Sequence, residues 1–159
     1  MKVRDRIGKA LGRVPSGLFI VTARYEDRQD AVLASWVNQC SFEPPAVTIA
    51  LAKTRPARLL VEASQSFIVN VLNKDPNGLL KRFCKAPADP NASVFEGLEV
   101  QEGFKGITVL KDAVSYLECE VVDQRPVGDH VVYFGKIVGG GILQGGEPYV
   151  HVRTNGFSY

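Results

Sequence analysis

The 159-residue sequence contains few of the residues that usually build metal centres or disulfide frameworks. It has three cysteines, Cys40, Cys84 and Cys119, which lie far apart and form no CxxC pair. An odd and sparse set of cysteines predicts neither a zinc knuckle nor a disulfide scaffold. The two histidines, His130 and His151, cannot form an HExxH motif, so no metal site is expected.

The sequence also lacks an excess of charge of either sign and any long hydrophobic run. Nineteen Lys and Arg against 17 Asp and Glu leave a net charge of +2, which is too balanced for a dedicated nucleic-acid binder. No apolar run approaches the roughly 20 residues that cross a bilayer, and the basic N-terminal residues precede no apolar signal region. We therefore expect one cytoplasmic domain over residues 1–159, with neither nucleic acid nor a membrane as a partner.

The common nucleotide and nucleophile motifs are absent as well. The glycines near the C-terminus do not have GxGxxG spacing, and no GxxxxGK[ST] segment occurs. There is no GxSxG elbow and no adjacent nucleophile–base pair. A Rossmann dinucleotide site, a P-loop and a serine hydrolase site are therefore excluded, and any cofactor must be held in another way.

Hydrophobic periodicity predicts a mostly β barrel or sandwich with a few helices. Strands outnumber helices and do not alternate with them as βαβ units. Helices are expected at 3–12, 57–64 and 76–83, and strands at 17–25, 31–35, 46–52, 66–72, 114–127, 130–142 and 149–152. The 46–52 strand is apolar on both faces and is expected to be central. Turns are expected at 26–30 and 128–129, and a long irregular excursion at 84–106.

Two segments on either side of the 46–52 strand are candidates for binding. The first, residues 33–45, is interpreted as a polar loop with hydrogen-bonding side chains at Ser35, Asn38, Gln39 and Ser41. Loops on a β scaffold carry binding residues, and such a loop can meet the edge of a planar heterocycle while an aromatic side chain covers its face. A polar turn with a packed tryptophan is the alternative.

The second candidate is Lys53-Thr54-Arg55, directly before the helix expected at 57–64. Two cations, a hydroxyl and a helix N-terminus suit a phosphate, although a solvated loop carrying stray charges is the alternative. His130 follows the Gly128-Asp129 turn and either titrates near neutral pH or forms a structural hydrogen bond.

Four segments resemble the flavin-reductase-like, FMN-binding split-barrel family: VPSGLFIVTAR, ASWVNQCSFEPPAVTIALAKTRP, FIVNVL and GDHVVYFGKIV. The resemblance runs from about Gly8 to the C-terminus, and its most specific parts are the Glu-Pro-Pro segment and the GDH turn. The opening KALGRVPSGLFIVTA is also similar to the flavin-reductase module of flavodiiron proteins of oxygenic phototrophs.

This resemblance implies a mostly β fold, a six-stranded antiparallel Greek-key split barrel with a few short helices, which forms a homodimer. It implies that FMN lies near the subunit interface and that NAD(P)H stacks on it beside the GDH turn, which makes His130 the candidate catalytic residue. The residues that match the isoalloxazine and ribityl segment are Ala34, Ser35, Trp36, Val37, Asn38, Cys40 and Ser41. The residues that match the phosphate region are Ala52, Lys53, Thr54, Arg55, Ala57 and Arg58, with Phe83.

One departure from the family pattern concerns positions 36 and 37, where small hydroxyl residues are usual. Trp36 and Val37 stand there, which favours packing against the isoalloxazine over hydrogen bonds to the ribityl chain. We expect an FMN-binding oxidoreductase that transfers hydride from NAD(P)H to flavin, chemistry that belongs to the flavin and needs no protein nucleophile. The alternatives are an electron-transfer module for a partner protein and a non-catalytic flavin- or haem-binding sensor.

Overall fold

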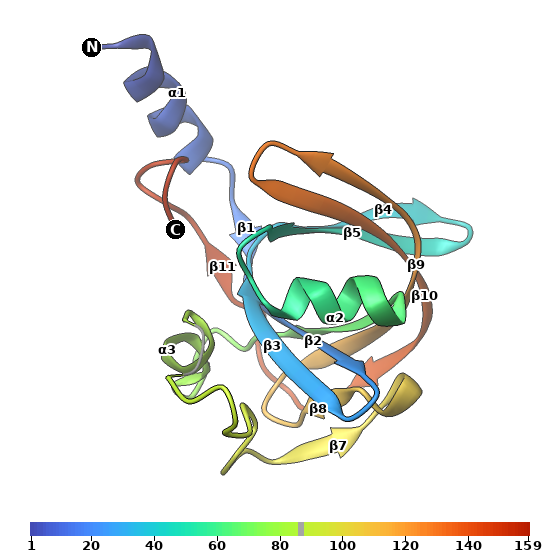
Figure 1. Ribbon diagram of the computed structural model, residues 1–159. Helices are drawn as coiled ribbons and strands as arrows, with labels where there is room; N and C mark the ends of the chain where they lie inside the picture. The colour runs from blue at the N-terminus through green and yellow to red at the C-terminus, as the bar shows by residue number, and fades with distance from the viewer. Residues whose placement is uncertain (86–87) are drawn as a thin grey trace.

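The computed structural model describes residues 1–85 and 88–159, and antiparallel strands are its main regular elements (Figure 1). The elements of the described residues are, in chain order, α1 (Val3–Gly12), β1 (Ser16–Gly17), β2 (Phe19–Tyr25), β3 (Arg28–Ala34), β4 (Val37–Phe42), β5 (Pro45–Ala52), α2 (Ala57–Ser64), β6 (Ser66–Val71), α3 (Leu79–Phe83), β7 (Val100–Glu102), the 3-10 turn η1 (Phe104–Gly106), β8 (Thr108–Leu110), β9 (Ser115–Val127), β10 (His130–Ile142) and β11 (Val150–His151).

The main sheet has seven strands in the order β3-β2-β6-β9-β10-β5-β4, and neighbouring strands run antiparallel. The sheet curls until β3 comes close to β5, yet in the described part of the chain no ladder joins these two strands. The barrel therefore stays split. The predicted mostly β, antiparallel split barrel with short helices is confirmed, with seven strands in the main sheet in place of six.

Alternation along β5 and β10 builds the core. Val47, Ile49 and Leu51 point inward from β5, and Val131 and Tyr133 point inward from β10. Side chains at every second position share one face of a strand, so these residues meet across the paired strands. The β5 strand is paired on both sides, as predicted, but only one of its faces is fully buried.

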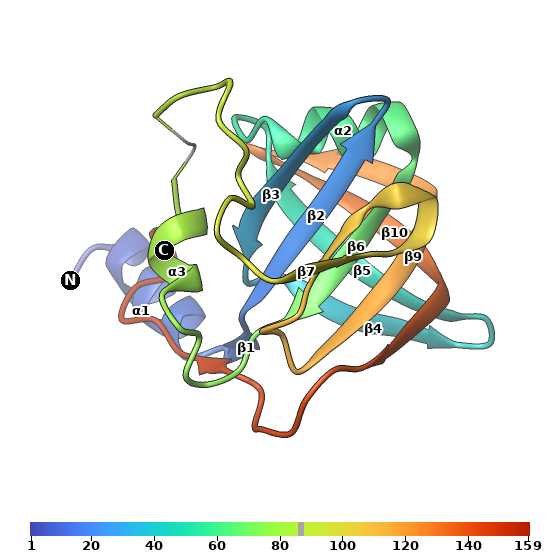
Figure 2. The same cartoon turned by 90° about the horizontal axis from the view of Figure 1, so that it is seen from below.

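The α2 helix closes one end of the barrel (Figure 2). Its buried residues, Ala57 and Val61, lie four positions apart and therefore on one face, and the helix packs against β2, β3 and β6. It ends where Gln65 adopts a left-handed conformation with φ of 55°. This helix has the residue range that the sequence predicts. Among the described residues, no helix is both long enough and apolar enough to cross a membrane.

Three expectations need correction. The polar segment at 33–45 is not a loop, because Val37–Phe42 pairs with β5 as the edge strand β4. The turn expected at 26–30 is shorter, because β3 already begins at Arg28. The excursion expected at 84–106 contains β7 and η1, while its residues 86–87 lie outside the described part of the chain.

The α1 helix lies beside the segment 153–159, away from the barrel (Figure 1). Two carbonyls of α1 accept backbone hydrogen bonds from this segment: Arg153 N–H donates to Gly12 at 3.1 Å and Gly156 N–H to Gly8 at 2.6 Å. Such a close approach requires glycine at position 12, since a Cβ there would lie 2.5 Å from the Arg153 carbonyl oxygen. The helix therefore fixes the course of the chain that follows β11.

Candidate functional site

The turn between β9 and β10 brings two of the predicted groups together. His130 begins β10 and pairs with Ala52 at the end of β5. The Lys53 N–H donates to the Asp129 carbonyl at 2.9 Å, which ties the first residue after β5 to the turn. Gly128 has a φ of 57°, a left-handed conformation that glycine adopts at low cost in a two-residue turn. The GDH turn and the start of the cationic segment therefore share one corner of the sheet.

Trp36 joins this corner from the connection between β3 and β4. Its carbonyl accepts a hydrogen bond from the Ala50 N–H at 3.0 Å. Its ring centroid lies 4.7 Å from that of His130, with the two planes inclined by 44°. The His130 side chain is only 12% exposed. The tryptophan and the histidine thus form a half-buried aromatic pair at the surface.

Both ring nitrogens of His130 have partners. Nδ1 lies 2.6 Å from Asp129 Oδ1, and Nε2 lies 2.8 Å from the Tyr159 hydroxyl. The hydrogen bond with His130 lowers the pKa of the exposed Asp129, so this carboxylate is ionised and can only accept. Partial burial raises the pKa of Tyr159, so the phenol keeps its proton. A neutral imidazole here carries its hydrogen on Nδ1 and accepts a hydrogen bond from the Tyr159 hydroxyl at Nε2.

Two residues of the site were missed by reasoning from the sequence. The Tyr159 ring lies 5.6 Å from Trp36, and the Arg153 guanidinium lies 5.5 Å from the Trp36 ring. Arg153 Nη1 also donates to the Ser158 carbonyl at 3.1 Å, which holds the turn that leads to Tyr159. Neither residue belongs to a periodic segment, and only their position in the fold reveals them.

The three cations of the 52–58 region differ in their partners. Arg55 donates from Nη1 to the Cys84 carbonyl at 3.1 Å and from Nη2 to the Phe83 carbonyl at 3.3 Å, which joins this region to the end of α3. Arg58 forms an ion pair with Glu62 at 2.6 Å, one helical turn further along α2. Lys53 is exposed, and its ammonium has no partner in the described part of the chain. Lys53 is therefore the cation most available to a ligand.

The start of α2 offers fewer donors than the sequence suggests. The Arg58 N–H donates to the Arg55 carbonyl and the Leu59 N–H to the Pro56 carbonyl, so part of the first turn is already satisfied. Thr54 is exposed beside this turn. Ala57 is buried in the main core, and Phe83 is buried in a second cluster, so the side chains of these two predicted residues support the fold.

The residues at 34–41 are spread along the sheet. Ala34 and Ser35 are buried and Val37 is half-buried, whereas Asn38 and Cys40 are exposed on β4. Ser41 pairs with Ala46, six positions before Ala52 in β5, which is about 20 Å along a strand. Within one chain the fold therefore gathers Trp36, Ala52, Lys53 and His130, but not Cys40 or Ser41.

Two buried polar atoms support a bound group near these residues. Ser35 Oγ and Arg55 Nε are both buried and have no hydrogen-bond partner in residues 1–85 and 88–159. Buried polar atoms in native proteins are normally satisfied, and an exception indicates a missing water, ion or ligand. One atom lies in each of the two segments predicted to hold the flavin, so the residues present fit such a group.

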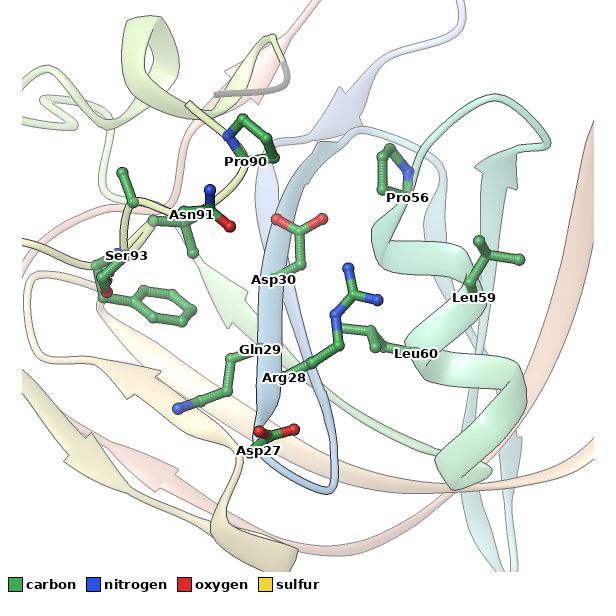
Figure 3. A pocket seen from close by; sticks show the side chains of 13 residues that line it. Asp27, Arg28, Gln29, Asp30, Pro56, Leu59, Leu60, Pro90, Asn91 and Ser93 are labelled. Carbon is green, nitrogen blue, oxygen red and sulfur yellow. Dashed lines mark hydrogen bonds between the residues drawn. The ribbon is translucent and has the colours of Figure 1, made fainter. Parts of the chain in front are cut away.

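A hollow lies against α2, on the side of residues 90–95 (Figure 3). It is a cleft of about 710 Å³ between α2 and residues 90–95, with Asp27–Asp30 as its floor. Burial raises the pKa of Asp30, opposed by the Ala31 N–H and by the charges of Arg55 and Arg28. None of the predicted site residues lines this cleft.

Within the described ranges, no group of three His, Cys, Asp or Glu side chains is arranged to hold a metal ion.

Comparisons with known proteins agree on one family. The sequence model described as "Flavin reductase like domain" matches residues 11–158. Diflavin flavoprotein A 1 of Synechocystis sp. PCC 6803 is 36% identical over 152 residues, which are 95% of this chain and 26% of that protein. The chain thus spans about a quarter of this curated relative.

Solved structures share the fold. The NADH:FAD oxidoreductase SgcE6 of Streptomyces globisporus C-1027 superimposes with a TM-score of 0.85 at 22% identity, covering 96% of this chain and 92% of that one. The flavin reductase HpaC complexed with NADP+ gives a TM-score of 0.78 at 24% identity, covering 90% of this chain and 89% of that one.

Proposed function

The chain belongs to the flavin reductase like family, and from that premise we propose that residues 1–159 form one domain that binds FMN and transfers hydride to it from NAD(P)H. The observation that carries the proposal is the meeting of Trp36, His130 and Lys53 at one corner of the sheet. A site for a flavin mononucleotide and a nicotinamide requires an aromatic surface, a hydrogen-bonding side chain and an accessible cation, and this corner supplies all three.

Each residue has a role that follows from its surroundings. Lys53 binds the flavin phosphate, and Arg55 holds the segment against the end of α3 through its two Nη atoms. Trp36 packs against the ring system. His130, oriented through Nδ1 by Asp129, offers Nε2 to the carboxamide of the nicotinamide. Bound FMN supplies the hydride chemistry, and the chain supplies binding and orientation.

Two comparisons support the redox partners. One solved neighbour is an NADH:FAD oxidoreductase, and another was solved with NADP+. We favour FMN over FAD because the corner offers one phosphate-sized cationic position at Lys53 and the sequence contains no dinucleotide cradle.

The test is an anaerobic titration of the FMN-loaded chain with NADH and NADPH, followed by loss of the flavin absorbance. Lys53→Ala should weaken FMN about tenfold, as expected for one lost charge-assisted contact, while riboflavin binds as before. Lys111→Ala removes an exposed lysine elsewhere and serves as the matched control. Equal losses for FMN and riboflavin, or flavin that neither nucleotide reduces, would contradict the proposal.

A second candidate function is an electron-transfer module of a longer protein. This function is favoured by the match to a diflavin flavoprotein, because the chain covers only about a quarter of that longer protein. If reduced flavin in this domain passes electrons faster to a covalently joined or added partner protein than to free FMN, the module function is the better description. A chromophore with haem bands in place of flavin bands would instead indicate a haem sensor.

We also propose that the chain forms a homodimer through the edge of the sheet. Within residues 1–85 and 88–159 the β4 strand has a neighbour on one side only, and Phe42 at its end is 88% exposed. An edge strand that ends in a large exposed aromatic side chain suits pairing with a second copy. Sedimentation equilibrium should give twice the chain mass, and Phe42→Asp should shift the population toward monomer; a monomeric wild-type chain would refute this.

A further inference from the structure

We propose that Tyr159 occupies the nicotinamide position of this site and that NAD(P)H must displace it in order to bind. The inference rests on the proposed function, because that function assigns the nicotinamide carboxamide to His130 Nε2. It concerns a residue outside both segments that the sequence singled out. It makes Tyr159 a determinant of nucleotide affinity.

His130 has no ring nitrogen left for a ligand. Asp129 holds Nδ1 at 2.6 Å, and the Tyr159 hydroxyl lies 2.8 Å from Nε2. Asp129 is the adjacent residue in the turn, and its ionised carboxylate makes the charge-assisted and therefore stronger of the two hydrogen bonds. A carboxamide can therefore reach His130 only at Nε2, and only after the Tyr159 hydroxyl leaves it.

Tyr159 matches a nicotinamide in shape and in hydrogen bonding. It presents a flat six-membered ring at 5.6 Å from Trp36 and a hydrogen-bond donor to Nε2. A nicotinamide presents a flat ring and an amide donor in the same combination. Arg153 lies 5.5 Å from the Trp36 ring, where its guanidinium can meet the pyrophosphate of the incoming nucleotide.

The Tyr159 side chain can move while the segment that carries it stays in place. The residue is 76% exposed, and its side chain is held by one hydrogen bond and by ring contacts with Trp36 and His130. The chain just before it is anchored more firmly, because Arg153 and Gly156 donate to the α1 carbonyls of Gly12 and Gly8. Rotation of the Tyr159 side chain is therefore enough to uncover the pair.

The experiment compares Tyr159→Phe and Tyr159→Ala with the wild-type chain in titrations with NAD+ and with ADP-ribose. ADP-ribose lacks only the nicotinamide, so it is the matched control ligand. Tyr25→Phe, which removes a phenol on β2 away from the site, is the control variant. Trp36 is the single tryptophan of the chain, so its fluorescence reports on this site even without flavin. Binding is also measured by calorimetry.

Loss of the hydroxyl should tighten NAD+ roughly fivefold, the value of one net hydrogen bond, and loss of the whole ring should tighten it further. ADP-ribose should bind the same in every variant. Weaker NAD+ binding to Tyr159→Phe, or equal changes for both ligands, would overturn the inference. If NADH reduces the wild-type flavin and NAD+ affinity is unchanged in the variants, only this inference fails. If neither the wild-type chain nor either variant binds NAD+, the proposed function fails with it.

Discussion

Replacing Gly12 by alanine tests how the α1 helix controls the segment that carries Tyr159. The new Cβ would lie 2.5 Å from the Arg153 carbonyl oxygen and 3.0 Å from the Asn155 nitrogen. Both are backbone atoms, so neither can rotate away as the end of a side chain can. We expect α1 and the 153–159 segment to separate, because the alternative is a distortion of the pairing that follows β11.

Gly12→Ala can lower the free energy of unfolding by no more than the contacts between α1 and residues 153–159 contribute. Two backbone hydrogen bonds join α1 to the segment, at about 1 kcal/mol each. Arg4 lies 4.2 Å above the Phe157 ring, an exposed cation–π contact of about 0.5–1 kcal/mol. Since alanine favours a helix by up to about 1 kcal/mol over glycine, the net loss should be about 2 kcal/mol. In a domain of this size, that lowers the melting temperature by about 4–8 °C.

Gly8→Ala is the matched control in the same helix. Its Cβ would meet the Asn155 Oδ1 atom at 2.7 Å, the end of a side chain that can turn aside. We expect Gly8→Ala to melt within about 2 °C of the wild type, because the helix gain offsets a small rearrangement. Calorimetry measures both variants. Trp36 emission should shift toward that of an exposed indole in Gly12→Ala alone, since Tyr159 then leaves the ring.

A Gly12→Ala variant that melts at the wild-type temperature with unchanged Trp36 emission would show that α1 does not control this segment. Equal losses of stability in both glycine variants would show that backbone and side-chain obstacles do not differ in their effect.

Three further predictions concern the barrel. Asn70 is buried and makes three hydrogen bonds, so Asn70→Leu should cost at least about 3 kcal/mol in denaturant unfolding because three partners lose their bonds. Burial raises the pKa of Cys119 to about 12, so a thiol reagent should modify only the exposed Cys40 and Cys84 until the protein is unfolded. Burial raises the pKa of Asp30, so the stability that its protonated carboxyl contributes is fully present below pH 3.8 and is lost as the pH rises. Asp30→Asn should therefore raise the melting temperature at pH 7 but not below pH 3.8.

Each has a clear contrary result. An Asn70→Leu variant as stable as the wild type would mean that its partners find other bonds. Three reactive thiols in the native chain would mean that the sheet around Cys119 opens readily. Asp27→Asn alters an exposed carboxylate beside the same cleft, and an equal rise in melting temperature for this variant would assign the effect to net charge.

The sequence predicts those elements whose apolar side chains recur with the period of a helix or of a strand. Both α2 and β10 have the predicted bounds, because each has a regular apolar face and a definite terminator. The edge strand β4 was missed because its polar residues Asn38, Gln39 and Cys40 are consecutive and exposed. A strand with solvent at its side does not need the alternation that a buried strand shows.

The candidate site was predictable in part for the same kind of reason. Lys53 and His130 lie at the ends of regular strands, so a pattern of strands and turns places them near each other. Trp36 could be identified only as an aromatic residue within a polar segment. Tyr159 and Arg153 reach the site through a chain that has almost no regular structure after β11, and no periodicity in the sequence predicts such a path.

The length of β9 and β10 has a consequence for the internal motions of this protein. Each strand has 13 residues; β9 pairs with β6 and β10, and β10 pairs with β9 and β5. Amide hydrogens in this part of the sheet should exchange with solvent only when the whole domain opens. Those of α1 and residues 153–159, joined to the rest by few bonds, should exchange through much smaller openings. Each such opening moves Tyr159 away, so solvent can reach the Trp36 and His130 side chains repeatedly within the lifetime of one folded molecule.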